Sequence, residues 1–394
     1  MCLAAGLGVL LCSPLLAQKR YDPGASDTEI RIGHIAPYSG PASAYGTIGQ
    51  AALAYVAKVN AEGGVNGRRI ELISVDDAYN PAKTVEQARR LVEHDEVLAV
   101  FGALGTAQNL AIRRYMNAKK VPQLFVATGA TRFGDPQAFP WTMGWQPTYQ
   151  DEARVYAQHI LATRPNAKVA VLLQNDDFGK DYLKGFMDAL GDKAASMVVA
   201  QATYEVTDAT VDSQVLALKA SGADVFFNIA TPKFAAQAIR KAGESGWKPT
   251  QYLASVSIFI SAVLKPAGLD HATGVISASF IRDPQDETLQ SSRELADYLA
   301  FMQRYYPAGD AGEFLNVLGY SMAQTLVQTL RQAGDELTRE NLMKQAASLS
   351  MTLPMLHPGI GVKTGADDYR PIEKVQLVRF NGTRYESLGQ PLGR

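Results

Sequence analysis

The segment at residues 29–81 constrains the fold more than any other part of this chain. Residues 30–35 alternate between the two faces of a predicted strand, and a loop rich in Ser, Gly and Pro follows. Apolar residues at helical spacing, a Gly-Gly turn and a second predicted strand at residues 70–75 come next. This strand–loop–helix–strand unit predicts a parallel sheet with helices on its faces. Ligands of such sheets bind at the carboxyl ends of the strands, so the loop is a candidate site.

The same alternation continues through the rest of the chain. Short apolar runs predict further strands at residues 97–101, 123–127, 168–173, 224–229, 251–255 and 274–280. Helical spacing predicts helices at residues 109–119, 178–190, 232–242, 290–305, 313–333 and 338–347. Near the end, Asn381-Gly382 lies between alternating runs and predicts a hairpin. Periodicity therefore predicts an α/β protein made of repeated strand–helix units.

Length and composition limit the function classes. The chain has 394 residues, which is enough for two domains. It is 47% hydrophobic and 20% charged, as is ordinary for a soluble globular protein. The net charge is −1 and the Lys and Arg residues are scattered. No long-range field therefore favours nucleic acid or an anionic membrane, and we expect no nucleic-acid partner.

Residues 1–17 form an apolar run that ends on Ala17. The run is shorter than the roughly 20 residues that span a bilayer, and it is typical of a secretory signal, although a positively charged start is missing. A buried N-terminal helix and lipoprotein processing at Cys12 are the alternatives, the latter disfavoured because Leu11 is not small. The only cysteines are Cys2 and Cys12, so cleavage near Ala17 leaves no disulfide and no cysteine-ligated metal.

Two more loops follow predicted strands of the first half, and both are rich in small and hydroxyl-bearing residues. One contains Thr106 and Ala107, and the other contains Thr128, Gly129 and Thr131. Where a strand gives way to a helix, free backbone N–H groups and the helix dipole favour an anion such as a carboxylate. Threonine hydroxyls add donors to such a site. The alternative is that these threonines only cap their helices.

Three ordered motifs carry a family resemblance. They read SGPxxxYG, NxxGGxxGxxIEL and DDxxxP, and the match extends over nearly all of residues 28–394. The chain resembles the branched-chain amino-acid-binding type of periplasmic solute-binding protein, the extracytoplasmic receptor of ABC importers. The resemblance implies a two-lobe type I fold, each lobe a mainly parallel sheet flanked by helices, with three crossings between the lobes. It places lobe 1 at residues 28–144 plus 281–352 and lobe 2 at residues 145–280 plus 353–394.

The resemblance also implies the biology and the site residues. We expect a monomer in the periplasm that delivers a small ligand to the transmembrane subunits of an ABC permease, without cofactor or metal. Thr106 and Thr131 match the family's Ser/Thr pair that binds the ligand carboxylate, and Gly129 offers backbone contacts. The remaining candidates are aromatic positions of the family and other residues near the expected cleft, for which ordinary packing is the alternative: Tyr45, Trp145, Tyr149, Phe178, Thr231 and Phe259.

One departure from the family pattern bears on the ligand. Amino-acid-binding relatives place an acidic residue near the position of Val256, where it pairs with the ligand ammonium. Here residues 251–265 contain no Asp or Glu. An ammonium buried without a countercharge costs several kcal/mol, so the sequence favours an aromatic or other hydrophobic monocarboxylate over an α-amino acid. An acidic residue from elsewhere, such as Asp176, would restore amino-acid binding.

Other function classes receive little support from the sequence. The five His residues show no metal-ligand spacing, and neither a nucleophile elbow nor a Walker loop is present. Asp76-Asp77 resembles a carboxylate pair for acid–base work but is expected to be structural at the end of a strand. We therefore expect no enzyme. A receptor for branched-chain or other amino acids or amides and a ligand-sensing domain of the same fold remain the alternatives.

Overall fold

The computed structural model describes residues 19–393. The N-terminal run at residues 1–17, predicted to be a signal, lies outside the described residues. No helix within residues 19–393 is long and apolar enough to cross a membrane.

A parallel five-stranded sheet forms the core of the first lobe. Its order is β3-β2-β4-β5-β6, with β2 (Glu29–Ala36), β3 (Arg69–Asp76), β4 (Ala99–Phe101), β5 (Gln123–Val126) and β6 (Thr142–Gly144). The sequence predicted the first four of these strands to within two residues at each end. The helices that follow them are α1 (Gly46–Ala61), α2 (Pro81–Glu93) and α3 (Thr106–Ala118).

The second lobe is built on a larger mixed sheet of order β16-β15-β11-β10-β9-β7-β8. Its parallel strands are β7 (Val169–Gln174), β8 (Val198–Tyr204), β9 (Val225–Ile229), β10 (Thr250–Leu253) and β11 (Ile276–Ser279). The antiparallel strands are β15 (Lys374–Phe380), β16 (Tyr385–Ser387) and β17 (Leu392–Gly393). The predicted hairpin at Asn381-Gly382 joins β15 to β16. The helices are α4 (Tyr149–Thr163), α5 (Asp177–Leu190), α6 (Ala194–Met197), α7 (Asp212–Ala220), α8 (Pro232–Glu244), α9 (Lys265–Ala267) and α10 (Leu269–Ala272).

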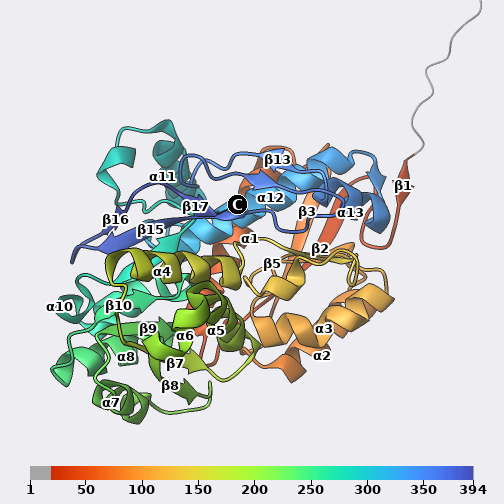
Figure 1. Ribbon diagram of the computed structural model, residues 1–394. Helices are drawn as coiled ribbons and strands as arrows, with labels where there is room; N and C mark the ends of the chain where they lie inside the picture. Colours follow the sequence, from red (N-terminus) through yellow and green to blue (C-terminus); the bar gives the residue numbers. More distant parts are fainter. Residues whose placement is uncertain (1–18, 394) are drawn as a thin grey trace, which may run out of the picture.

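The chain passes between the two lobes three times. It leaves the first sheet after β6, and it returns after β11 to add α11 (Arg293–Tyr305), α12 (Phe314–Ala333) and α13 (Arg339–Ala346). The buried face of α12 packs against α1, so these late helices belong to the first lobe (Figure 1). The last passage carries the chain through the small pair β13 (Ser350–Met351) and β14 (Val362–Lys363) to β15. The result is a two-lobe α/β molecule with helices flanking each sheet (Figure 1).

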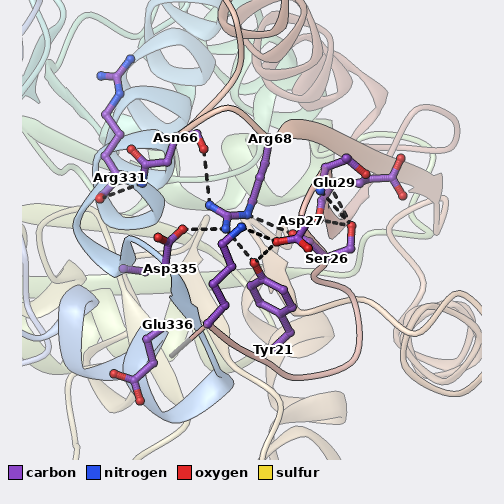
Figure 2. A network of polar contacts seen from close by, with 12 residues as sticks. Tyr21, Ser26, Asp27, Glu29, Asn66, Arg68, Arg331, Asp335 and Glu336 are labelled. Atoms are coloured by element: carbon purple, nitrogen blue, oxygen red, sulfur yellow. Dashed lines mark hydrogen bonds and ion pairs between the residues drawn. The ribbon is translucent and has the colours of Figure 1, made fainter. Parts of the chain in front are cut away.

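A buried arginine ties the N-terminal strand to the first lobe. Arg68 is only 2% exposed, and its guanidinium donates to the Tyr21 hydroxyl at 2.8 Å and to Asp335 at 2.6 Å (Figure 2). These contacts lie beside the parallel pair formed by β1 (Arg20–Tyr21) and β12 (Glu336–Leu337). A buried cation needs such partners, and this network anchors Tyr21 to the first lobe.

The paired aspartates at the end of β3 hold the neighbouring loops. Asp76 accepts hydrogen bonds from Tyr38 N, Ser39 N and the Ser39 hydroxyl. Asp77 is fully buried and accepts from Tyr79 N and the Thr84 hydroxyl. These contacts match the structural role that the sequence favours for the pair.

Candidate functional site

A cavity lies between the lobes, where strands of both sheets end. Residues of both lobes and of the segments that connect them line it. The first lobe contributes Tyr45, Ile48, Tyr79, Leu104, Gly105, Thr106, Ala127 and Leu318. The facing and connecting segments contribute Gln146, Tyr149, Phe178, Thr231, Ser255, Val256, Ile258, Phe259, Ala278, Ser279, Phe280 and Ile281. None of these lining side chains is charged.

The N-terminus of α3 opens onto this cavity. Gly105 precedes the helix and no side chain caps it, so the first-turn N–H groups have no partner inside the helix. Gly105 has φ +100°, and a Cβ there would lie 2.2 Å from the Gln108 side-chain oxygen. Glycine is therefore required for this approach to the cavity. The free N–H groups and the helix dipole favour an anion at this point.

A chain of hydroxyl groups continues from this helix end. The Thr128 hydroxyl donates to the Tyr149 hydroxyl at 3.2 Å, and it accepts from Ala130 N at 3.2 Å. Because Thr128 has only one proton, Thr106 must be the donor in the 2.7 Å contact between the two threonine hydroxyls. The proton of Tyr149 is then left for a ligand. Burial raises the pKa of Tyr149 above its usual range, so this group stays a neutral donor.

Aromatic rings form much of the remaining wall. Tyr149 packs edge-to-face on Phe178, with ring centroids 5.3 Å apart, and stacks on Tyr182 at 4.4 Å. From the first lobe, Tyr45 meets Phe259 edge-to-face at 6.0 Å and donates its hydroxyl to Val256 O at 2.8 Å. Tyr45 thus links the two lobes across the cavity. Such rings offer a large apolar surface with few polar atoms.

The structure brings together six of the predicted site residues in the cavity lining, namely Tyr45, Thr106, Tyr149, Phe178, Thr231 and Val256, and Phe259 lies with them. The Thr231 hydroxyl is engaged by Tyr204 at 3.2 Å and Gln174 at 3.3 Å, so it faces the cavity with its polar group already paired. Thr128 lies one layer behind, as the link between Thr106 and Tyr149. Ala107 lies in the first turn of α3 but outside the lining.

Three predicted residues lie elsewhere than expected. Thr131 does not join Thr106, because its N–H and hydroxyl both donate to Asp181 of α5, at 2.7 and 3.0 Å. Gly129 O accepts from Tyr149 N at 2.7 Å, and a Cβ on Gly129 would touch the Tyr149 ring. Trp145 is fully buried, with its indole N–H donating to Thr325 at 3.0 Å. Gly129 and Trp145 thus contribute to packing around the site.

A buried carboxylate that was not predicted from the sequence, Glu152, lies behind the cavity. Glu152 of α4 is 2% exposed and accepts hydrogen bonds from Ser255 N and the Ser255 hydroxyl. Burial raises the pKa of Glu152, while hydrogen bonds from Ser255 and Tyr156 oppose that rise. The sequence was searched for an acidic residue near Val256, and Glu152 lies more than a hundred positions before it. The one signal in the sequence is that Tyr149 and Glu152 are three positions apart in α4 and so lie on the same face of that helix. Tyr79, Gln146 and Phe280 of the lining were also missed.

Comparison with known proteins agrees with this architecture. Residues 29–384 match the family described as "Periplasmic binding protein". "Leu/Ile/Val-binding protein homolog 7" of Brucella abortus (strain 2308) is 26% identical over 240 residues, which is 57% of this chain and 58% of that protein. The chain thus spans a little over half the length of this relative.

Two solved structures share the fold. A branched chain amino acid ABC transporter protein from Thermus thermophilus with bound valine has a TM-score of 0.83 at 16% identity, covering 94% of this chain and 97% of that chain. A fatty acid ABC transporter substrate-binding protein from Thermomonospora curvata has a TM-score of 0.78 at 22% identity, covering 95% of each chain. At these identities the likeness shows the two-lobe type I fold. The chain belongs to the periplasmic binding protein family.

Proposed function

We propose that this protein is the extracytoplasmic substrate-binding receptor of an ABC uptake system. It binds a small monocarboxylate with an aromatic or other hydrophobic body between its lobes and delivers it to the transmembrane subunits of a permease. The periplasm is the expected location, since the family is one of periplasmic binding proteins. We also infer a binding role without chemistry on the ligand, because the family is one of binding proteins.

The cavity lining is the observation that carries the ligand class. It is uncharged and mainly apolar and aromatic, and the free end of α3 and the Tyr149 hydroxyl supply hydrogen-bond donors to it. A carboxylate accepts from N–H and O–H groups there, while the apolar walls bury the rest of the ligand. The fatty acid ABC transporter substrate-binding protein with the same fold supports a hydrophobic acid.

Branched-chain amino-acid binding is the second candidate. The names of the Brucella relatives and the valine-bound structure favour it. Glu152 adds a negative charge behind Ser255, although its two oxygens already accept from Ser255 and Tyr156. An ammonium in the cavity would therefore meet this charge only through the Ser255 hydroxyl, which leaves it poorly compensated.

A thermal-shift screen of the purified protein followed by calorimetry tests the proposal. The panel comprises benzoates, cinnamates, medium-chain fatty acids and the branched-chain amino acids. A ligand at 100 times its dissociation constant stabilises by about 2.7 kcal/mol, which gives a clear shift. We expect hydrophobic acids to bind. Tight leucine binding without a response to any of the acids would overturn the proposed ligand class.

A further inference from the structure

We propose, resting on the function proposed above, that Ser255 and Glu152 form a second polar subsite that accepts a hydrogen bond from the ligand. The ligand is then a hydrophobic acid that also carries a neutral donor, such as a hydroxyl group, away from its carboxylate. Benzoic acids with a ring hydroxyl represent this class.

The proton of the Ser255 hydroxyl is already used in a hydrogen bond to Glu152. The Ser255 hydroxyl donates to Glu152 Oε2 at 2.5 Å, and Ser255 N donates to Oε1 at 2.8 Å. Tyr156 donates to the same Oε1 at 2.7 Å. These three donors favour the ionised form of Glu152 against the effect of its burial. A carboxylate only accepts hydrogen bonds, so the single Ser255 proton is directed toward Glu152. Ser255 itself lines the cavity, and its hydroxyl oxygen keeps its lone pairs, so it can serve only as an acceptor for a ligand.

The hydroxyl group of Tyr182 is also buried near Ser255 and Glu152. Tyr182 is fully buried, and its oxygen has no hydrogen-bond partner among residues 19–393. The nearby charge of Glu152 adds to burial in raising the pKa of this phenol. A serine oxygen has two lone pairs. Even with Tyr182 turned toward Ser255, one lone pair remains for a ligand, so this corner has unused hydrogen-bonding capacity.

The charge of Glu152 fixes the orientation of the ligand. A ligand carboxylate is repelled from this corner and attracted to the free N-terminus of α3. The opposite, donor-bearing end of the ligand therefore faces Ser255. A neutral hydroxyl fits better than an ammonium because Glu152 is enclosed by Ser255 and Tyr156 and offers no direct ion pair.

The test compares hydroxybenzoates with fluorobenzoates of the same ring position, since fluorine resembles a hydroxyl in size but donates no hydrogen bond. Calorimetry measures the dissociation constants of benzoate and of the 2-, 3- and 4-substituted pairs. We expect at least one hydroxybenzoate to bind about 10-fold more tightly than its fluoro partner, as one buried hydrogen bond supplies. Ser255→Ala should abolish this preference. Glu152→Gln should reduce the preference, because its amide can donate to Ser255 and turn the serine proton toward the cavity.

Ser257→Ala is the matched control. Ser257 lies in the same 3-10 helix, Ser255–Ser257, outside the cavity lining, and its hydroxyl donates to Ala230 O at 2.6 Å. This variant should keep the preference.

Equal binding of every hydroxy and fluoro pair, or a preference that survives Ser255→Ala, would overturn the subsite while benzoate binding still supports the proposed function. If no benzoate binds and leucine binds tightly in a Ser255-dependent way, both proposals fail and the subsite serves an ammonium.

Discussion

In the proposed carboxylate site, the Tyr149 hydroxyl is the donor on which we expect binding to depend most. It is the free donor at the end of the chain from Thr106 through Thr128. Thr106 donates to Thr128, so it orders this chain of hydroxyl groups without a free proton of its own. In the proposed site, the free end of α3 and the Tyr149 hydroxyl therefore take the role that the resemblance gave to Thr106 and Thr131.

Substitution of Tyr149 should therefore weaken the binding of acids. Tyr149→Phe keeps the ring but removes the donor, and we expect a loss of about 1.5–3 kcal/mol, the range for hydrogen bonds to charged groups. Thr106→Val should have a smaller effect, since it acts through Thr128. Calorimetry with a bound acid measures both. Tyr115→Phe is the control, because that hydroxyl donates to Glu93 outside the cavity; equal affinities of Tyr149→Phe and wild type would contradict the assignment.

A buried histidine makes stability depend on pH. His34 of β2 is 1% exposed and contacts the Ser74 hydroxyl at 2.8 Å, and burial lowers its pKa from 6.5 to about 4. Between these two pH values the unfolded chain binds a proton at this residue and the folded chain does not. The free energy of unfolding should therefore fall by about 2–3 kcal/mol from this residue as the pH drops from 6.5 to 4.

Urea unfolding at a series of pH values measures this dependence. His34→Asn keeps a polar group near Ser74 but does not titrate, so its curve should be flatter between pH 4 and 6.5. His357, whose pKa burial lowers to about 4, and His159, whose pKa burial also lowers, remain in both proteins and contribute to the residual slope. Identical slopes for wild type and His34→Asn would show that His34 does not contribute.

At the scale of elements, α5 holds the lobes together at the edge of the cleft. Asp181 accepts from Thr131 N and the Thr131 hydroxyl through one oxygen, and from the Gln150 side chain at 2.7 Å through the other. Thr131 belongs to the first lobe and α5 to the second. The Asp181 carboxylate thus accepts the hydrogen bonds that the resemblance implied Thr131 would donate to the ligand.

Loss of this contact should shift the protein toward an open form. Asp181→Ala removes both acceptors, and we expect a larger radius of gyration without ligand and an affinity several-fold weaker, because the competent form is less populated. Small-angle scattering and calorimetry give the two values. Asp188→Ala on the same helix is the control, since Asp188 is exposed and pairs with Lys184 of its own helix. If both variants behave alike, Asp181 is not an interlobe contact of consequence.

At the scale of the whole molecule, two lobes with three connections predict a hinge. The cavity has walls from both lobes, so a ligand gains contacts only when the lobes are together. Ligand shifts the equilibrium by its extra affinity for that form. Scattering with a saturating acid should give a smaller radius of gyration than scattering without it. An unchanged radius with confirmed binding would indicate a rigid pocket.

The sequence determined the alternating strands and helices, because apolar periodicity and turn residues are local signals. Buried strands such as β2 and β9 and the hairpin at Asn381-Gly382 were predicted from them. The edge strand β8 was missed: its burial alternates along the strand, but the apolar Val199 lies on the exposed face and obscures the pattern in the sequence. Tyr45, Thr106, Tyr149, Phe178, Thr231 and Val256 were also named from loops and motifs before the structure placed them around one cavity.

Only the tertiary structure decided which polar groups meet. Glu152 and Ser255 are 103 positions apart, and so far-separated a pair is joined only when α4 packs beside the end of β10. Thr131 likewise finds Asp181 across the cleft, 50 positions away. Sequence patterns record which face of an element is buried, but hydrogen-bond partners depend on how elements from different lobes pack. The family, the fold and several lining residues of the cavity could therefore be predicted from the sequence. The direction of each hydrogen bond at the site could not.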